Sequence, residues 1–123
     1  MMAACAAARA GVQVVLYEQN AVCGKKLRIT GKGRCNVTND CTPAQVMENV
    51  ARNRKFLYSA LSRFSPSDVM AFFEAQGVPL KTERGRRVFP VSDHAKDVSG
   101  ALGDWLRRAG CEVRRGTVTG HTV

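Results

Sequence analysis

The chain has 123 residues, which is enough for one modest domain and too few for two. Hydrophobic residues make up 45% of it, and this content favours a packed core over disorder. The formal net charge of +9 predicts attraction to polyanions such as nucleotides, nucleic acid or an anionic membrane, although a basic surface with no specific partner has the same charge.

The five cysteines include no CxxC pair, so the spacing predicts neither a zinc site nor a redox dithiol, and we expect no metal. The apolar start MMAACAAARAG lacks the basic region of a signal peptide. No apolar run approaches the roughly 20 residues that cross a bilayer. We therefore expect free thiols, a cytoplasmic location and no membrane partner.

The first part of the chain predicts a helix, a strand and a second short helix. Met1–Ala10 is rich in alanine and is followed by Gly11, a residue typical of the position just after a helix. Val12–Tyr17 is almost continuously apolar, which predicts a strand covered on both faces. Gly24–Ile29 is expected to form a short helix.

The middle of the chain predicts three helices. Thr42 and Pro43 supply a cap and a first-turn proline for a helix that ends near Val50. Arg54–Phe64 carries apolar residues at helical spacing, with Phe56 on the expected buried stripe. Ser65 and Pro66 begin a third helix that ends at Gly77.

The last part of the chain predicts strands and one long helix. Val78–Thr82 and Arg87–Val91 have the pattern of a β-hairpin that turns at Gly85. Asp93–Ala109 is expected to be a helix, and Cys111–Arg115 and Thr117–Val123 are expected to be strands. The helix would return the chain so that Cys111–Arg115 pairs parallel with the strand before Glu18. The fold class is therefore α/β, a partial Rossmann-like domain with an incomplete parallel sheet, helices and a hairpin.

Glu18 is the strongest candidate for a functional side chain. It follows the apolar strand directly, and a carboxylate at the carboxyl end of a parallel strand is where dinucleotide-binding folds hold the ribose hydroxyls. The alternative is a solvated glutamate at a strand end.

A basic, glycine-rich loop, GKKLRITGKGRCNVTN, occupies residues 24–39. Its cations repel one another unless they are solvated or face an anion. We expect Lys26 and Arg34 to face a ligand, and Lys25 and Lys32 to be solvated. Gly31 and Gly33 would let backbone amides approach a ligand closely, although GxG alone also fits a flexible turn.

The end of this loop carries small polar side chains. Asn36, Thr38 and Asn39 can read a heterocycle edge or a ribityl chain, or they can equally form Asx turns before the next helix. Cationic neighbours lower the pKa of a thiol, but no histidine lies near Cys35 in the sequence, and a structural thiol is the favoured interpretation.

The run YEQNAVCGKKLRITGKGRCNVTN resembles the amino-terminal region of the BaiN/RdsA-like, or aminoacetone-oxidase-like, FAD-dependent oxidoreductases. Their pattern is a strand that ends in Glu, followed by GxKxxxSGxGxCNxTN or a close variant. The chain has Thr30 in place of the Ser and matches the pattern at Glu18, Gly24, Lys26, Gly31, Gly33, Cys35, Asn36, Thr38 and Asn39.

The resemblance implies that FAD binds in a Rossmann-like domain. Glu18 would take the adenosine ribose, while Lys26 and the backbone of Thr30, Gly31 and Gly33 would approach the pyrophosphate. Arg34, Cys35, Asn36 and Thr38 would lie near the ribityl and flavin end, and Val118 would contact adenine through its backbone. The resemblance names no catalytic residue and no substrate.

The chain also departs from the family pattern. The family begins with a strand and a GGGxAG-type turn, and its members are much longer. We therefore expect residues 1–123 to be a single partial FAD-binding domain, a fragment that binds FAD weakly or not at all and is inactive by itself. A redox role with an unidentified small organic substrate is the primary hypothesis.

The alternative hypothesis is a small basic nucleic-acid-binding protein. Basic clusters at Lys25–Arg34, Arg52–Lys55, Arg84–Arg87 and Arg114–Arg115 support it. A nucleic-acid partner is the less favoured expectation, because the sequence shows no recognised nucleic-acid fold and no platform of regularly spaced aromatics on which bases could stack.

Overall fold

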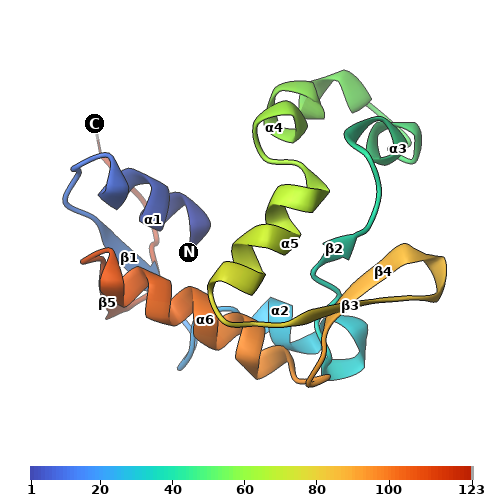
Figure 1. Cartoon of the computed structure of the whole chain (residues 1–123). Coiled ribbons are helices and arrows are strands. Elements are labelled where there is room, and N and C mark those ends of the chain that lie inside the picture. Colours follow the sequence, from blue (N-terminus) through green and yellow to red (C-terminus); the bar gives the residue numbers. More distant parts are fainter. Residues whose placement is uncertain (123) are drawn as a thin grey trace.

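The computed structural model describes residues 1–122 and contains two small sheets joined by one long helix (Figure 1). The helices are α1 (Met2–Arg9), α2 (Lys25–Ile29), α3 (Pro43–Glu48), α4 (Tyr58–Arg63), α5 (Pro66–Ala75) and α6 (Ala95–Arg108), with short 3-10 turns η1 (Thr30–Gly33), η2 (Arg54–Leu57) and η3 (Arg84–Arg86). The strands are β1 (Val15–Glu18), β2 (Thr38–Asn39), β3 (Leu80–Glu83), β4 (Arg87–Pro90) and β5 (Glu112–Arg115). No helix within residues 1–122 is long and apolar enough to span a bilayer.

The first sheet is a parallel pair, and it confirms the expected crossover through α6. β1 and β5 run parallel, with Val15 opposite Glu112 and Glu18 opposite Arg115. Within residues 1–122, β1 pairs with β5 alone, so its other edge is open. The prediction that this strand is covered on both faces is wrong: Tyr17 is 53% exposed, because only the face that carries Val14 and Leu16 packs against the core.

The second sheet is antiparallel and has the strand order β2-β4-β3. The predicted hairpin is confirmed, and Gly85 adopts the left-handed conformation at its turn (φ 75°). β2 was not predicted, since two residues carry too little pattern to reveal a strand. The strand expected across residues 117–123 is absent through residue 122, where the chain makes no ladder hydrogen bonds; Val123 lies outside the described residues.

The two predicted proline-containing helix starts are confirmed. Thr42 and Ser65 each cap a helix with a reciprocal capping box. The helix expected over Arg54–Phe64 is instead divided into η2 and α4. This segment begins after Asn53, whose left-handed φ of 54° prevents α3 and the segment from forming one continuous helix. Phe56 is 86% exposed, so its assignment to a buried stripe is wrong.

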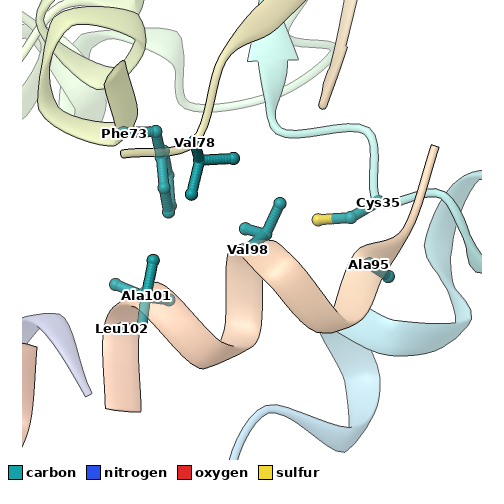
Figure 2. Close-up of a cluster of buried hydrophobic side chains, with 7 residues drawn as sticks. All are labelled: Cys35, Phe73, Val78, Ala95, Val98, Ala101 and Leu102. Atoms are coloured by element: carbon teal, nitrogen blue, oxygen red, sulfur yellow. The ribbon is translucent and has the colours of Figure 1, made fainter. Parts of the chain in front are cut away.

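α6 carries the core, as its spacing predicts. Val98 and Leu102 lie in one buried cluster with Phe73, Val78 and others, and Figure 2 shows these side chains converging above the helix. Leu106, one turn further along, lies in a second cluster that joins α1 to the start of β5. The partly buried Trp105 packs against both clusters, so one helix face holds the two sheets together.

We predict that Leu102→Ala destabilises the protein by about 2–5 kcal/mol, because it removes a 4% exposed side chain and leaves a cavity between α6 and α5. The matched control, Lys96→Ala, changes an exposed position of the same helix and should stay within about 0.5 kcal/mol of the parent. Urea unfolding followed by far-ultraviolet circular dichroism measures both. Equal effects of the two substitutions would contradict the assignment of the core.

Candidate functional site

Glu18 is the last residue of β1, and its carboxylate is held in one orientation. Oε1 accepts hydrogen bonds from the backbone N of Asn20 (2.8 Å) and from the side-chain Nδ2 of Asn20 (2.6 Å). These bonds hold the pKa of Glu18 below its usual value, so the group is ionised at neutral pH. Among the described residues Oε2 has no hydrogen-bond donor and is available to accept one from a ligand.

A small hollow of about 200 Å³ opens beside this carboxylate. Glu18 and Asn20 line it from the end of β1, and Val113 and Arg115 line it from β5. The carboxyl ends of two parallel strands are where open α/β sheets bind ligands. Arg115 therefore joins Glu18 at this edge, a placement that the sequence pattern does not reveal.

The basic loop forms a tight, left-handed turn. Gly31, Lys32 and Gly33 all have positive φ (57°, 58° and 86°), and the N–H of Cys35 closes the turn on the carbonyl of Thr30 (3.0 Å). A Cβ on Gly31 would lie 2.7 Å from the ring of Phe89. Gly31 is therefore needed for close packing on β4, whereas a Cβ on Gly33 would meet only the carbonyl oxygen of Arg28, at 4.0 Å.

The guanidinium of Arg34 is bound by other residues of the protein. Its guanidinium lies 4.1 Å from the ring centre of Phe89 and binds Glu83 (2.9 Å) and Asp93 (3.3 Å). Lys81 binds the same two carboxylates, at 3.5 and 2.7 Å. The charge of Arg34 is thus neutralised locally, and any contact of this side chain with a ligand would compete with these carboxylates.

The other loop cations divide into one bound residue and three free ones. Arg28 donates from Nε to Ser99 Oγ of α6 (2.9 Å), which ties the loop to the long helix. Lys25, Lys26 and Lys32 are exposed and form no ion pair within residues 1–122. Lys26 thus remains available for an anion.

A second hollow, of about 260 Å³, lies beside Gly33. Besides Gly33 and Ala95, its lining consists of Arg28, His94 and Lys96, so most of the side chains around the hollow are basic. His94 and Lys96 come from the start of α6, and the sequence analysis gave neither a role, because they lie about sixty residues beyond the loop in the chain.

The polar residues at the end of the loop line a third hollow, of about 750 Å³. Asn36 and Thr38 line it together with Gln45, Asn49 and Arg86. Asn36 donates a hydrogen bond from Nδ2 to the carbonyl of Thr38 (2.8 Å). Within residues 1–122 its side-chain oxygen accepts no hydrogen bond, so it can accept one from a ligand. Gln45, Asn49 and Arg86 could not be predicted as part of this site, because they come from α3, its C-terminal end and the hairpin turn.

Cys35 lies beneath this surface and not on it. Its side chain is fully buried against Val98 in the cluster drawn in Figure 2, and burial raises the pKa of its thiol. The side chain therefore packs the loop onto α6, and only its backbone can reach a ligand.

Four of the predicted residues line three separate hollows, and none of these hollows is lined by both Glu18 and a predicted residue of the loop. Glu18 lies at the first, Gly33 at the second, and Asn36 and Thr38 at the third. Val118 lies apart from all three, is 68% exposed and is not in a strand, so its expected adenine contact has no support from the fold. Within residues 1–122, no group of three or more His, Cys, Asp or Glu residues could hold a metal ion.

We predict that Gly31→Ala destabilises the protein more than Gly33→Ala does. Both substitutions put a side chain at positive φ, at a cost of about 1–2 kcal/mol each, but only the first also collides with Phe89. Urea unfolding compares the two variants directly. Equal losses of stability would show that the loop does not pack on β4 as described.

We also predict that acid weakens the attachment of the loop. Hydrogen bonds from Arg34 and Lys81 lower the pKa values of Glu83 and Asp93 respectively, so their contribution to stability is present at neutral pH. It is lost as the pH falls below about 4, through the lowered folded-state pKa values.

The double variant Glu83→Gln/Asp93→Asn should therefore lose less stability than the parent between pH 7 and pH 3, as measured by urea midpoints. Asp104→Asn, which changes an exposed pair on α6, should leave the pH dependence close to that of the parent. The prediction fails if the double variant and the parent show the same pH dependence.

Comparison with known proteins identifies the family. The family described as the HI0933-like protein Rossmann domain matches residues 1–121. The chain is 35% identical over 118 residues to a 3-dehydro-bile acid delta(4,6)-reductase of Clostridium scindens, covering 94% of this chain and 28% of that protein. It is 34% identical over 77 residues to a ribosomal RNA dihydrouridine synthase of Haemophilus influenzae, covering 60% of this chain and 18% of that protein.

The chain therefore spans less than a third of the length of these relatives. The match confirms the α/β Rossmann-type fold class, the flavoprotein resemblance and FAD as the cofactor of the family. The ionised glutamate at the end of a parallel strand, the basic loop that follows it and the family match lead to one conclusion: this chain belongs to the HI0933-like Rossmann family of FAD-dependent oxidoreductases.

Proposed function

We propose that this chain supplies the FAD-binding surface of an oxidoreductase, with the adenosine ribose on Glu18. One observation carries the proposal: the carboxylate at the carboxyl end of β1 is ionised, is oriented by Asn20 and keeps one oxygen free of hydrogen bonds within residues 1–122. A ribose hydroxyl pair needs such an acceptor. Arg115, across the hollow, would contribute positive charge near the adenosine phosphate.

The pyrophosphate would lie along the basic loop. The hollow beside Gly33 is lined by three basic side chains, and Gly33 itself presents open backbone. Lys26 is exposed and has no carboxylate partner in the described part of the chain. In this proposal Lys26 and the backbone of Thr30, Gly31 and Gly33 contact the phosphates, while Arg28 holds the loop to α6.

The ribityl chain and the flavin ring would occupy the third hollow, of about 750 Å³. Its lining is rich in amide and hydroxyl groups, including Asn36 and Thr38, which suit the polar edge of the ring and the ribityl hydroxyls. Arg34 and Cys35 would act mainly by holding the loop, Arg34 through Glu83 and Cys35 through the core. Contact between the Val118 backbone and adenine stays a proposal from the family resemblance alone.

Bound FAD would supply hydride or electron transfer, and the residues of this chain would bind and orient it. We propose a small organic substrate, because the relative whose match covers 94% of this chain is named for a bile acid. The other relative is named for ribosomal RNA, so the family is not confined to one substrate class. We place the activity in the cytoplasm, in keeping with five free cysteines.

The first experiment adds a family-like β-strand and a GGGxAG turn before Met1. The open edge of β1 can accept the strand, and the turn adds backbone N–H groups for the pyrophosphate. The purified product should carry flavin absorbance and release FAD on denaturation. A folded product that remains colourless in excess FAD would contradict the proposal.

The second experiment tests Glu18 in that extended chain. Glu18→Gln should weaken FAD binding about tenfold to a hundredfold, because a charged hydrogen-bond acceptor is lost. Its affinity for FMN, which has no adenosine ribose, should not change. Glu112→Gln, at the start of β5, is the matched control and should bind FAD like the parent. Equal loss of FAD and FMN affinity in Glu18→Gln would contradict the ribose assignment.

A further inference from the structure

A second basic surface lies far from the loop, on the turn η2 and the start of α4. We call it the aromatic–cation face, and it consists of Arg52, Arg54, Lys55, Phe56 and Tyr58. Phe56 is 86% exposed and Tyr58 is 64% exposed. Exposed rings of this size cost free energy in water, and the core uses neither of them.

The position of the face makes it accessible. α3, η2 and α4 form a compact group at the N-terminal end of α5, away from α6 (Figure 1). Two hollows adjoin there, of about 630 and 540 Å³, and Lys55 lines both. Tyr58 borders the first and Phe56 borders the second, so a ring and a cation flank each hollow.

The face is strongly positive, and Glu48, which lines the first hollow with Arg54 and Lys55, is the one carboxylate among the residues that line the two hollows. Residues 50–64 contain four Arg or Lys residues and no Asp or Glu. Within residues 1–122, none of the cations of the face forms an ion pair, whereas Arg34, Lys81, Arg107 and Arg114 all do. Three adjacent free cations at residues 52–55 repel one another, and an anion would relieve that repulsion.

We propose that the aromatic–cation face binds single-stranded nucleic acid. Exposed aromatic rings provide stacking surfaces for unpaired bases, and the neighbouring cations Arg52, Arg54 and Lys55 can contact the phosphates of the same strand. A duplex fits less well, because α4 is only six residues long and cannot fill a major groove. Aromatic residues are not regularly spaced in the sequence, so this pair of exposed rings was not predicted from it.

The test uses the 123-residue chain and a fluorescein-labelled oligouridylate of about twelve nucleotides, within the range of known single-strand sites. Fluorescence anisotropy should show binding that weakens with salt, with a log–log slope of roughly −2 for three phosphate contacts. Phe56→Ala and Tyr58→Ala should each weaken binding about five- to a hundredfold, since each loses a stacked base. Phe56→Tyr keeps the ring and should bind like the parent.

The controls separate a site from general charge attraction. Arg54→Gln should lower both the affinity and the salt slope, while Arg9→Gln, an exposed cation on the distant helix α1, should leave both unchanged. Because Phe56 is exposed, Phe56→Ala should unfold at the same urea concentration as the parent, and a loss of binding would then not reflect unfolding.

Three binding results would overturn the proposal: no binding at low salt, equal affinity of Phe56→Ala and the parent, or equal effects of Arg9→Gln and Arg54→Gln. A concentration-dependent dimer in sedimentation that Phe56→Ala abolishes would assign the face to a second copy and would also overturn it. Glu18→Gln should bind the oligonucleotide normally, so failure here leaves the flavin proposal intact.

Discussion

The burial of one face of α6 is the constraint on which the rest of the structure depends. Val98 and Leu102 pack with Phe73 from α5, and Leu106 packs in the second cluster with Cys5. The same helix binds the basic loop through Ser99 and Arg28. α6 therefore fixes both the strand pair that ends in Glu18 and the loop that follows it, so the candidate cofactor surface is a consequence of core packing.

Attachment of the loop determines which of its groups remain for a ligand. Gly31 packs against Phe89, Arg34 lies over the same ring and binds Glu83, and Cys35 is buried. These contacts hold one side of the turn to the protein. These contacts do not use the exposed backbone at Gly33 or the ammonium group of Lys26, which forms no ion pair within residues 1–122. The loop therefore has one side that is fixed to the protein and another side on which an anion can bind.

Local chemistry made much of this fold predictable from the sequence. The capping boxes at Thr42 and Ser65, the turn at Gly85 and the apolar period of α6 are all signalled by neighbouring residues. Contacts between distant segments were not predictable. The carboxylate partners of Arg34 lie 49 and 59 residues away, and the exposure of Tyr17 depends on which elements cover β1. The expectation that Arg34 faces a ligand therefore took no account of its ion pairs with Glu83 and Asp93.

The central claim is that Glu18 and the basic loop bind one coenzyme. Nuclear magnetic resonance of the ¹⁵N-labelled, extended chain tests it most directly, through titrations with FAD and with AMP. The account predicts that the amides of Glu18, Gly33 and Asn36 shift with FAD along one saturation curve, whereas AMP shifts only those near Glu18. Saturation of Glu18 and Asn36 at different FAD concentrations, or shifts at only one of them, would contradict it.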